Sequence, residues 1–507
     1  MSTTSTSLEP LFTFLSYSYA TLETNFYKIP GSAVVARYVR SSHQNDPGRT
    51  LLEVILILFA IRTLLQSRTR ADNSGKHFIK FEEKEIDELV EEWVPEPLAA
   101  PLSQREQADL AAVPIIVGAT GPKPKLSTGK TVINLASYNF TGLAGNEIVK
   151  ERSVETLRKY GLGSCGPPGF YGTQDVHIQL EQDLADFLGT ESAIIYSQAF
   201  STISSVIPAF CKRGDIIVAD RGVNFAIQKG LQISRSTIRW FDHNDMKSLE
   251  QVLESTEKER RKKKGPLTRR FIVTEGIFDH DGAMADLPKL VELKLKYKYR
   301  LILDESVSFG SVGRTGRGLT ELYNVSRING TSFVFSAAMP AMLSVAASEG
   351  INILRNTPSI LDTLQDNVHA VRAILERVDC ITIPSHQASP MIHLYVRLPS
   401  PTHLLPIAPS SPSLSSSGKP SNPLSVHPRD SEHFDLDLEE KLLQDIVEEA
   451  LAQGVMITRA KRLRGQELVE VKPSIRLAVT AALSRKDCEK AASVIKAAFV
   501  KVVGKRR

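Results

Sequence analysis

The sequence predicts an α/β protein in which a mostly parallel central sheet forms the larger domain. The first observation is that short apolar runs alternate with helical patterns between residues 131 and 310. The second is that these runs are apolar throughout, which is typical of parallel strands covered by helices on both faces. The third is size, since 507 residues with 42% hydrophobic and 23% charged side chains can build two or three domains. Five runs are expected to be strands: "SAIIYS", "DIIVAD", "TIRWF", "RFIVTEG" and "RLILDES".

Charge and cysteine content narrow the functional classes. A net charge of +5 is weak for a chain of this length and does not predict nucleic-acid binding. The dense basic run "EKERRKKKG" at 257–265 is expected to be a solvated loop. The four cysteines show no C-x-x-C pairing and no metal-ligand spacing, so no metal site is predicted and a reduced, cytosol-facing domain is the simplest interpretation. They are Cys165, Cys211, Cys380 and Cys488.

The N-terminal part differs from the rest. Residues 1–50 are interpreted as a membrane-proximal segment, and 67–130 as an arm and linker. Between them, "LLEVILILFAIRTLLQ" at 51–66 carries only Glu53 and Arg62 as charges. This run is shorter than the roughly 20 residues that a bilayer core requires, but charges near its ends can snorkel. It predicts a transmembrane or membrane-embedded helix, with a buried core helix as the alternative. It begins too late for a cleavable signal peptide.

Two domains follow this region. Residues 131–355 are predicted to form the large domain, and 356–507 a smaller α+β domain at the C-terminus. The smaller domain is interrupted at 400–430 by a stretch rich in proline and serine and poor in large apolar residues. Such a composition cannot bury enough apolar surface to fold, so a disordered insertion is predicted.

One acidic residue stands at a position where α/β proteins bind cofactors. Asp304 ends the apolar strand "RLILD", and ligands of open sheets bind in the crevice beyond the carboxyl ends of the strands. A carboxylate there is costly unless a donor or cation meets it. The pyridinium nitrogen of pyridoxal phosphate is one such partner. A turn or helix-capping role for Asp304 is the alternative.

A series of motifs is more specific than any single residue. The following occur in this order along the chain: "NLASYNFTGL", "YGLGSCGPPGFYGTQDVHIQLE", "VTEGIFDHDGAMADLPKLVEL", "LILDESVSFGSVGRTGRG" and "SIRLAVTAALSRKD". Together they resemble the α-oxoamine synthase family, over residues 81–398 and 432–500. The resemblance implies a pyridoxal-phosphate transferase of fold type I, in an enzyme class that condenses an amino acid with an acyl-CoA and releases carbon dioxide.

The chain departs from the catalytic pattern of that family at four positions. Phe225 stands where a histidine of an "N-H-A-S" turn stacks on the cofactor, and Val307 stands where "D-E-A-H" supplies a second histidine. Asp279 replaces a serine, and its charge is expected to sit badly near a phosphate. Asp304 is kept, which makes it a vestigial cofactor contact. The Schiff-base lysine of a "T-F-S-K" motif is absent, although its amine must form and exchange the imine. No catalytic residue is therefore predicted.

The region after the cofactor strand is also short. "FVFSAAMP" can be aligned with the lysine motif, which puts Ala337 at the lysine, but it matches a later family segment better. On the second alignment, roughly thirty residues are missing near 325. The alternatives are a natural shortening and a mis-spliced transcript or gene model. Deleting strands from a central sheet leaves its edges unpaired.

The glycine- and proline-rich loop at 163–181 is predicted to follow a stiff path. The resemblance puts this loop at a dimer interface, beside the partner's active site. It implies a supporting, substrate-adjacent role for Cys165, Phe170 and Tyr171, with plain loop packing as the alternative. His177 is expected either to contact that site or to cap a helix.

Within the family, "GSCGPPGFYGT", the "DES" triplet and the apolar N-terminal helix are most similar to members that lack catalysis. Such a chain pairs with a homologous lysine-bearing catalytic subunit, which holds pyridoxal phosphate, while this chain holds none covalently. The implied joint reaction joins serine and a long-chain acyl-CoA into 3-ketosphinganine at the endoplasmic reticulum membrane, with the globular domain cytosolic. Arg476 matches the family arginine that pairs with the substrate carboxylate. An active homodimer and a defective chain without a partner are the alternatives.

Overall fold

The structure is a computed structural model and describes residues 9–65, 82–93, 101–102, 104–263, 268–323, 337–397, 436–463, 466–468 and 471–504. Its contacts divide the chain into two units, Met1–Asp109 and Leu110–Arg507. The predicted insertion at 400–430 and the shortened junction near residue 325 lie outside the described residues.

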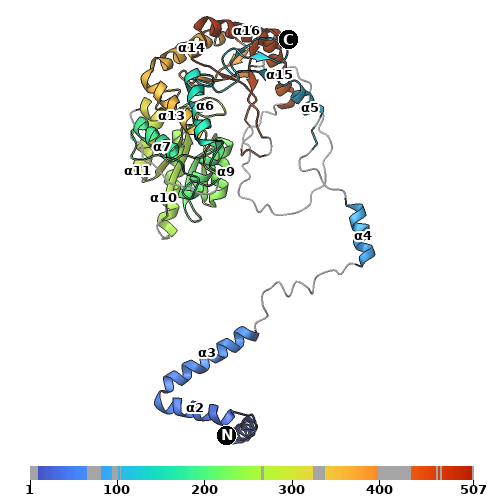
Figure 1. Cartoon of the computed structure of the whole chain (residues 1–507), viewed down its shortest axis with the longest axis vertical. Coiled ribbons are helices and arrows are strands. Elements are labelled where there is room, and N and C mark those ends of the chain that lie inside the picture. The colour runs from blue at the N-terminus through green and yellow to red at the C-terminus, as the bar shows by residue number, and fades with distance from the viewer. Residues whose placement is uncertain are drawn as a thin grey trace, which may run out of the picture. The chain divides into compact units, whose positions relative to one another are not determined.

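The first unit is helical where it is described (Figure 1). Helices α2 and α3 pack against each other, and the Tyr38 hydroxyl of α2 lies 3.4 Å from Glu53 Oε1 of α3. The helices are α1 (Glu9–Phe26), α2 (Ser32–Asn45), α3 (Pro47–Leu65), α4 (Glu83–Glu92) and α5 (Gln104–Ala111), the last of which crosses the division between the units.

The apolar run predicted at 51–66 forms helix α3, and it is not a buried core helix. Its large apolar side chains are exposed, including Leu52, Ile55 and Phe59. The prediction of a transmembrane helix is not supported, because none of the helices in the described part of the chain is both long and apolar enough to cross a bilayer. The 19 residues of α3 include Arg49 as well as Glu53 and Arg62, which dilutes its apolar character.

The second unit contains the remaining elements. Its helices are α6 (Glu147–Tyr160), α7 (Asp175–Leu188), α8 (Ala199–Phe210), α9 (Phe225–Ser234), α10 (Met246–Lys263), α11 (Leu287–Tyr297), α12 (Leu319–Leu322), α13 (Ala341–Asn356), α14 (Ser359–Leu375), α15 (Leu436–Ala452) and α16 (Arg485–Gly504). Its strands are β1 (Ile116–Val117), β2 (Lys125–Leu126), β3 (Ile133–Asn134), β4 (Ile216–Asp220), β5 (Thr237–Phe241), β6 (Arg270–Glu275), β7 (Arg300–Asp304), β8 (Ile381–Thr382), β9 (Met391–Val396), β10 (Val455–Met456), β11 (Thr458–Arg459) and β12 (Ile475–Ala478).

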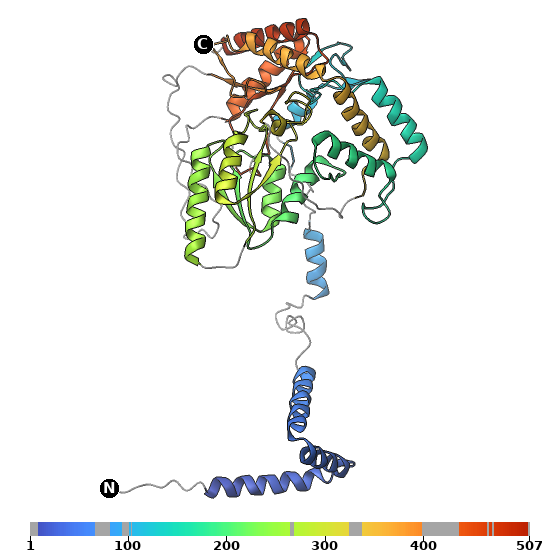
Figure 2. The same cartoon turned by 90° about the vertical axis from the view of Figure 1, so that its left-hand side faces the viewer.

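The larger sheet is parallel, as predicted, with the order β5-β4-β6-β7 (Figure 2). Successive side chains point to opposite faces. Val218 and Ile272 pack with α10 and α11 on one face, whereas Ile217 and Phe271 pack with α8 and α9 on the other. Burial on both faces explains why these strands are apolar throughout. The basic run at 257–265, predicted as a loop, instead continues α10 as far as Lys263.

The prediction of a strand at "SAIIYS" is wrong. Residues 192–197 have no strand assignment, although they are apolar. A strand exists only through backbone hydrogen bonds to a neighbouring strand, and none of the described strands pairs with this segment. The Ile195 N–H donates instead to Glu181 Oε1 at 3.1 Å. The segment lines a cavity of about 600 Å³, together with Leu184, Leu188, Ala338 and Met339. At the edge of the sheet, β7 pairs with β6 alone among the described strands.

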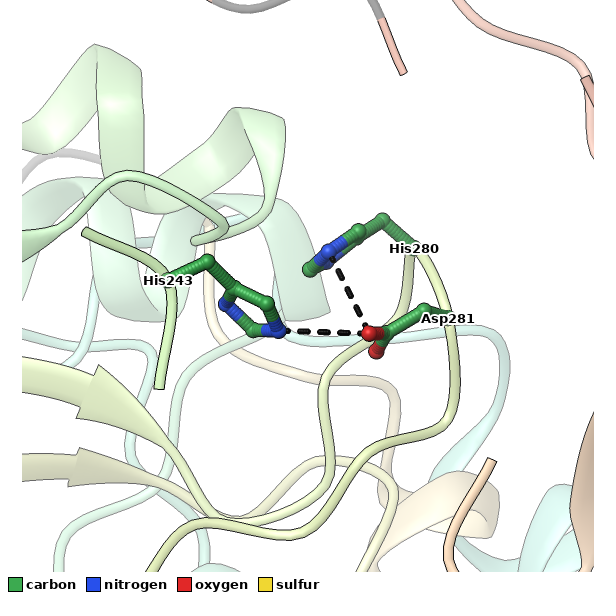
Figure 3. A group of neighbouring side chains, drawn as sticks. All are labelled: His243, His280 and Asp281. Atoms are coloured by element: carbon green, nitrogen blue, oxygen red, sulfur yellow. Dashed lines mark hydrogen bonds and ion pairs between the residues drawn. The ribbon is translucent and has the colours of Figure 1, made fainter. Parts of the chain in front are cut away.

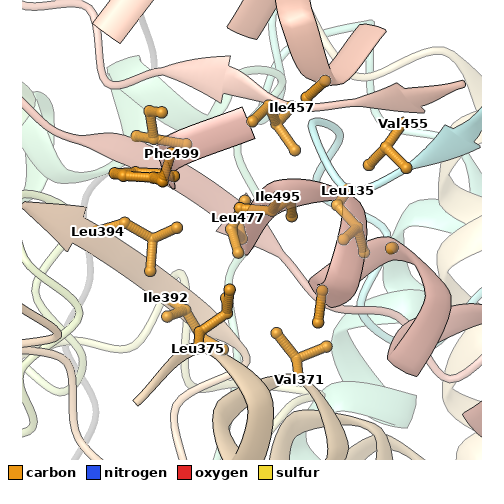
Figure 4. Packing of buried hydrophobic residues seen from close by; sticks show 14 of the residues in the cluster. Leu135, Val371, Leu375, Ile392, Leu394, Val455, Ile457, Leu477, Ile495 and Phe499 are labelled. Atoms are coloured by element: carbon orange, nitrogen blue, oxygen red, sulfur yellow. The ribbon is translucent and has the colours of Figure 1, made fainter. Parts of the chain in front are cut away.

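The C-terminal part is built on an antiparallel sheet with the order β11-β12-β9-β8. Its core combines side chains of this sheet with those of α14, α15 and α16 (Figure 4). Leu394 of β9 and Leu477 of β12 are fully buried against Val371 of α14 and Phe499 of α16. Helices α14 and α16 lie side by side over this core (Figure 1).

Candidate functional site

The carboxyl ends of three neighbouring strands carry buried acids. Asp220 ends β4, Glu275 ends β6 and Asp304 ends β7, and all three are less than 10% exposed. Glu275 and Asp304 stand opposite each other in the strand register. The predicted cofactor edge of the sheet therefore exists, and its chemistry depends on what each acid contacts.

Asp304 is held by donors of its own chain. Its Oδ1 accepts hydrogen bonds from the Ser306 backbone N–H (2.8 Å) and hydroxyl (2.5 Å). Its Oδ2 accepts one from the Asn224 side-chain amide at 3.2 Å. These contacts form the turn alternative raised by the sequence, and they satisfy the carboxylate without a cation.

Glu275 is the most deeply buried of the neighbouring acids that titrate abnormally. Burial raises the pKa of Glu275 well above its ordinary value, and the charges of Asp304 and Asp279 raise it further. Its two oxygens accept hydrogen bonds from the backbone N–H groups of Asn224 (2.5 Å) and Asp279 (3.2 Å). Glu275 therefore ties the loops after β4 and β6 together.

Phe225 and Val307, which stand where the family has histidines, pack mainly against other side chains in the structure. Phe225 begins α9, and its ring lies 6.1 Å from the ring of Phe200. The Lys229 amine lies over the Phe225 ring at 4.8 Å from its centroid. Val307 packs against the hydrophobic cluster under β6 and β7. Neither side chain can donate or accept a hydrogen bond, so neither replaces an imidazole.

Asp279 is neutralised by contacts that sequence motifs do not reveal. The Tyr138 hydroxyl donates to its Oδ1 at 2.7 Å, and Arg462 Nη1 lies 3.3 Å from its Oδ2. Burial raises the pKa of Asp279, but the Tyr138 hydrogen bond and the charges of Arg462 and Arg476 outweigh it and lower the pKa. The predicted unbalanced charge is therefore balanced within the chain. Arg462 was missed because it belongs to no motif.

Arg476 lies in β12 and faces the same cluster. Its guanidinium carbon is 4.4 Å from the centroid of the Tyr138 ring, a cation–π geometry. Its Nε is buried and makes no hydrogen bond within the described part of the chain. Arg476 therefore joins Tyr138, Asp279 and Arg462 in one cluster.

The three residues predicted to act in the glycine-rich loop are all exposed. Phe170 and Tyr171 are 69% and 76% exposed, and Cys165, also exposed, has a left-handed backbone with φ of 51°. Gly172 is required, because a Cβ there would collide with the Gly166 carbonyl. The predicted role of these three side chains beside a partner's site stays a prediction.

His177 is buried and has a capping role. Its Nδ1 accepts a hydrogen bond from the Gln174 backbone N–H at 2.9 Å, which leaves Nε2 to donate to the Met339 carbonyl at 2.6 Å. Nearby, the Ala338 N–H donates to the Gly166 carbonyl at 2.8 Å. The loop is therefore fastened to the segment that follows the shortened junction. Ala337, the alternative lysine position, is exposed.

The residues at the carboxyl edge do not fit pyridoxal phosphate. No lysine occurs between Lys298 and residue 350, the stretch in which the family places it. Asp304 is already bonded to Ser306 and Asn224, and Phe225 offers no polar atom. At this edge Phe225 and Val307 are apolar, and Asp304 is bonded within the chain.

Comparison with known proteins agrees with the fold. The family model described as aminotransferase class I and II matches residues 130–315. A high-resolution structure of SPT (serine palmitoyltransferase) with its pyridoxal phosphate internal aldimine is 18% identical, with a TM-score of 0.63 over 84% of this chain and 100% of that chain. The chain thus has the fold of the pyridoxal-phosphate-dependent aminotransferase class.

Two relatives define the family within this class. Serine palmitoyltransferase 1 of Saccharomyces cerevisiae is 35% identical over 540 residues, covering 96% of this chain and 95% of that protein. Long chain base biosynthesis protein 1c of Oryza sativa subsp. japonica is 42% identical over 351 residues, covering 63% and 71%. The chain belongs to the serine palmitoyltransferase 1 family, which confirms the resemblance predicted from the motifs.

The comparison with the Oryza protein also bears on the length of the chain. Its 351 aligned positions cover 63% of the 507 residues, about 319, so about 30 positions have no residue in this chain. The loss predicted near residue 325 stays a prediction.

Proposed function

We propose that this chain is the non-catalytic subunit of serine palmitoyltransferase. It pairs with a homologous subunit that supplies the lysine and holds pyridoxal phosphate, and the pair condenses L-serine with palmitoyl-CoA to 3-ketosphinganine. The observation that carries the proposal is the altered carboxyl edge of the sheet, where Phe225, Val307 and the bonded Asp304 replace a reactive site. Family membership supplies the reaction and the kind of partner.

In this proposal the chain supports its partner by contacts that its exposed glycine-rich loop makes. Phe170 and Tyr171 stand out from a loop whose path is fixed by glycines and by His177. Exposed aromatic side chains on a stiff loop lose little conformational entropy on binding, which suits an interface. We place this loop against the catalytic subunit, beside the acyl-CoA.

The test is co-expression of the full chain with a lysine-bearing homologue of the family. We expect the two to co-purify, 3-ketosphinganine to form from serine and palmitoyl-CoA, and a partner with its lysine changed to alanine to abolish product. The chain expressed alone should form no product and show no visible absorbance from a cofactor–lysine adduct. Product or such absorbance from the chain alone would overturn the proposal in favour of an active homodimer.

A defective chain is the second candidate, favoured by two features of the described residues: β7 pairs with β6 alone, and the 192–197 segment pairs with no strand. A chain lacking sheet strands exposes unpaired edges and pairs poorly. A matched variant receives the corresponding thirty or so residues of the Saccharomyces relative after Tyr323. If only the restored variant co-purifies with the partner, the chain is defective; equal recovery of both supports the non-catalytic subunit.

Membrane attachment is a further part of the proposal. We place α3 in one leaflet of the endoplasmic reticulum membrane and the globular unit on the cytosolic side. The apolar side chains of α3 support this, since they stay exposed beside the neighbouring helix α2. Flotation with lipid vesicles tests it. The full chain should float, and a variant with Ile55, Leu58 and Phe59 changed to serine should stay at the bottom; equal flotation of both would exclude α3 as the anchor.

A further inference from the structure

Two histidines and an aspartate converge beyond the carboxyl edge of the sheet (Figure 3). His243 follows β5, and His280 and Asp281 lie in the loop that follows β6. Their ligand atoms all lie within 4.8 Å of one another. Because β5 and β6 both flank β4, parallel strands deliver these loops to the same edge. No sequence motif predicts the cluster, because its members come from separate strands.

His243 is oriented by a buried carboxylate behind it. Its Nδ1 lies 2.9 Å from Oδ1 of Asp220, which is fully buried. Asp220 is itself fixed by the backbone N–H groups of Gly222 (2.6 Å) and Asn244 (2.8 Å). A carboxylate behind a histidine is the usual support of a metal-binding imidazole, since it fixes the tautomer and leaves Nε2 free to coordinate.

Asp281 directs one oxygen at both imidazoles. Its Oδ1 accepts a hydrogen bond from the Ala283 N–H at 2.8 Å. Its Oδ2 lies 3.2 Å from His243 Nε2 and 3.6 Å from His280 Nε2. Ligands held at zinc distances in a tetrahedron are separated by about 3.3 Å. The two spacings to Asp281 are close to this value, and the two imidazole nitrogens lie within 4.8 Å of each other.

Neither ring nitrogen of His280 makes a hydrogen bond within the described part of the chain. Its Nδ1 is buried without a partner among the described residues. Its Nε2 is 3.6 Å from Asp281, longer than a hydrogen bond. The ring packs against those of His243 (4.4 Å) and Phe278 (5.9 Å). A metal ion at Nε2 would give this ring one strong partner, whereas Nδ1 stays without one among the described residues.

The space in front of the imidazoles depends on a glycine. A Cβ at Gly222 would lie 2.3 Å from His243 Nδ1 and 2.5 Å from His280 Cε1. Only a residue without a side chain lets the two rings approach the backbone here. The turn after β4 is therefore shaped around this pair of histidines.

We propose that His243, His280 and Asp281 form a binding site for a divalent transition metal ion of the zinc type. Two imidazole nitrogens and one carboxylate oxygen are donors that such ions prefer over Mg²⁺ and Ca²⁺. His243 is 29% exposed, and the other two side chains are 12–13% exposed, so the fourth position faces water. The ion would clamp the loops after β5 and β6 together.

An alternative explanation without a metal ion accounts for part of this geometry. His243 can bridge Asp220 and Asp281 as a hydrogen-bonded ion pair, but this arrangement makes no use of His280. The two explanations therefore differ at His280. Replacing it removes a ligand from a metal site and leaves an ion-pair bridge intact.

The experiment uses the full chain, stripped with a chelator and titrated separately with Zn²⁺ and Co²⁺. We expect one equivalent of Zn²⁺ to bind and to raise the unfolding temperature, and bound Co²⁺ to show the intense visible bands of four-coordinate geometry. His280→Gln and Asp281→Asn should each weaken binding by about 100-fold or more. His369→Gln changes an exposed histidine on α14 and is the matched control.

The unfolding temperature of metal-free His280→Gln shows whether the variant is folded. A variant that is folded but not stabilised by Zn²⁺ has lost metal binding and not its fold. Equal Zn²⁺ stabilisation in this variant would overturn the proposal. If the variant does not fold, the Co²⁺ spectrum of the unaltered chain decides: weak bands of six-coordinate, solvent-like cobalt, or no stoichiometric binding, exclude the site. The partner subunit is not required, so this outcome is independent of the proposed function.

Discussion

The guanidinium carbon of Arg476 lies 4.4 Å from the centroid of the Tyr138 ring, and the Tyr138 hydroxyl donates to Asp279 at 2.7 Å. Asp279 in turn pairs with Arg462 at 3.3 Å. In the family pattern, Arg476 matches a substrate-binding arginine, whereas here it packs on a tyrosine of the same chain. The cluster thus uses inherited positions for structural contacts between the two parts of the second unit.

Replacing Tyr138 with phenylalanine tests this cluster. The variant keeps the ring under Arg476 and loses the hydrogen bond to Asp279. We expect the free energy of unfolding to fall by about 1 kcal/mol, since the site is partly open to water. The pKa of Asp279 should rise, because the tyrosine hydrogen bond helps to lower it. Denaturant unfolding and NMR titration measure both; an unchanged pKa would contradict the contact.

Replacing His177 with alanine tests the fastening of the glycine-rich loop. The change leaves the Gln174 N–H and the Met339 carbonyl without their partner, and His177 is buried. We expect a loss of about 2 kcal/mol in the free energy of unfolding. Hydrogen exchange in the loop should also become faster. His369→Ala, at an exposed histidine, should change neither; a similar effect of both variants would argue against a specific role of His177.

Asp304→Asn distinguishes a bonded turn residue from a cofactor ligand. The amide keeps one acceptor oxygen and replaces the other with an NH₂ donor, so it cannot accept from both Ser306 and Asn224. We expect a loss of about 1–2 kcal/mol in stability. The pKa of Glu275 should fall, because Asp304 is one of the charges that raise it. Product formation by the complex with the catalytic partner should be unchanged. Loss of product by a folded variant would show that Asp304 acts in the reaction.

The buried His393 makes stability depend on pH. Burial lowers its pKa from the ordinary 6.5 to about 3, and its Nδ1 lies 2.8 Å from the Ser474 hydroxyl. The stabilising contribution is complete above pH 6.5. It is lost as the pH falls towards 3, because in this window the unfolded chain binds a proton that the folded chain does not.

The expected slope in this window is about 1.4 kcal/mol per pH unit for one proton. His393→Asn retains a polar side chain that does not titrate, so its free energy of unfolding should fall less steeply between pH 6.5 and 4.5. His369→Asn should follow the unaltered chain. Parallel curves for all three proteins would show that His393 titrates normally in the folded state.

The local composition of the sequence predicted those strands whose position depends only on burial. The strands around Val218 and Ile272 are apolar because both faces are covered, and that pattern is visible in the sequence. The same pattern failed at 192–197, because a strand also requires a neighbour with free backbone groups. Phe225 and Val307 were identified through motifs. Arg462 and the His243–Asp281 pair were not, because their partners lie far along the chain.

The bonds between the glycine-rich loop and the segment around Met339 have a consequence for synthesis on the ribosome. His177 and Met339 are 162 positions apart, so the loop cannot acquire its final contacts until Met339 has left the exit tunnel. During that interval Phe170 and Tyr171 belong to a nascent, unanchored surface. The order of translation therefore delays the anchoring of this loop until long after its own synthesis.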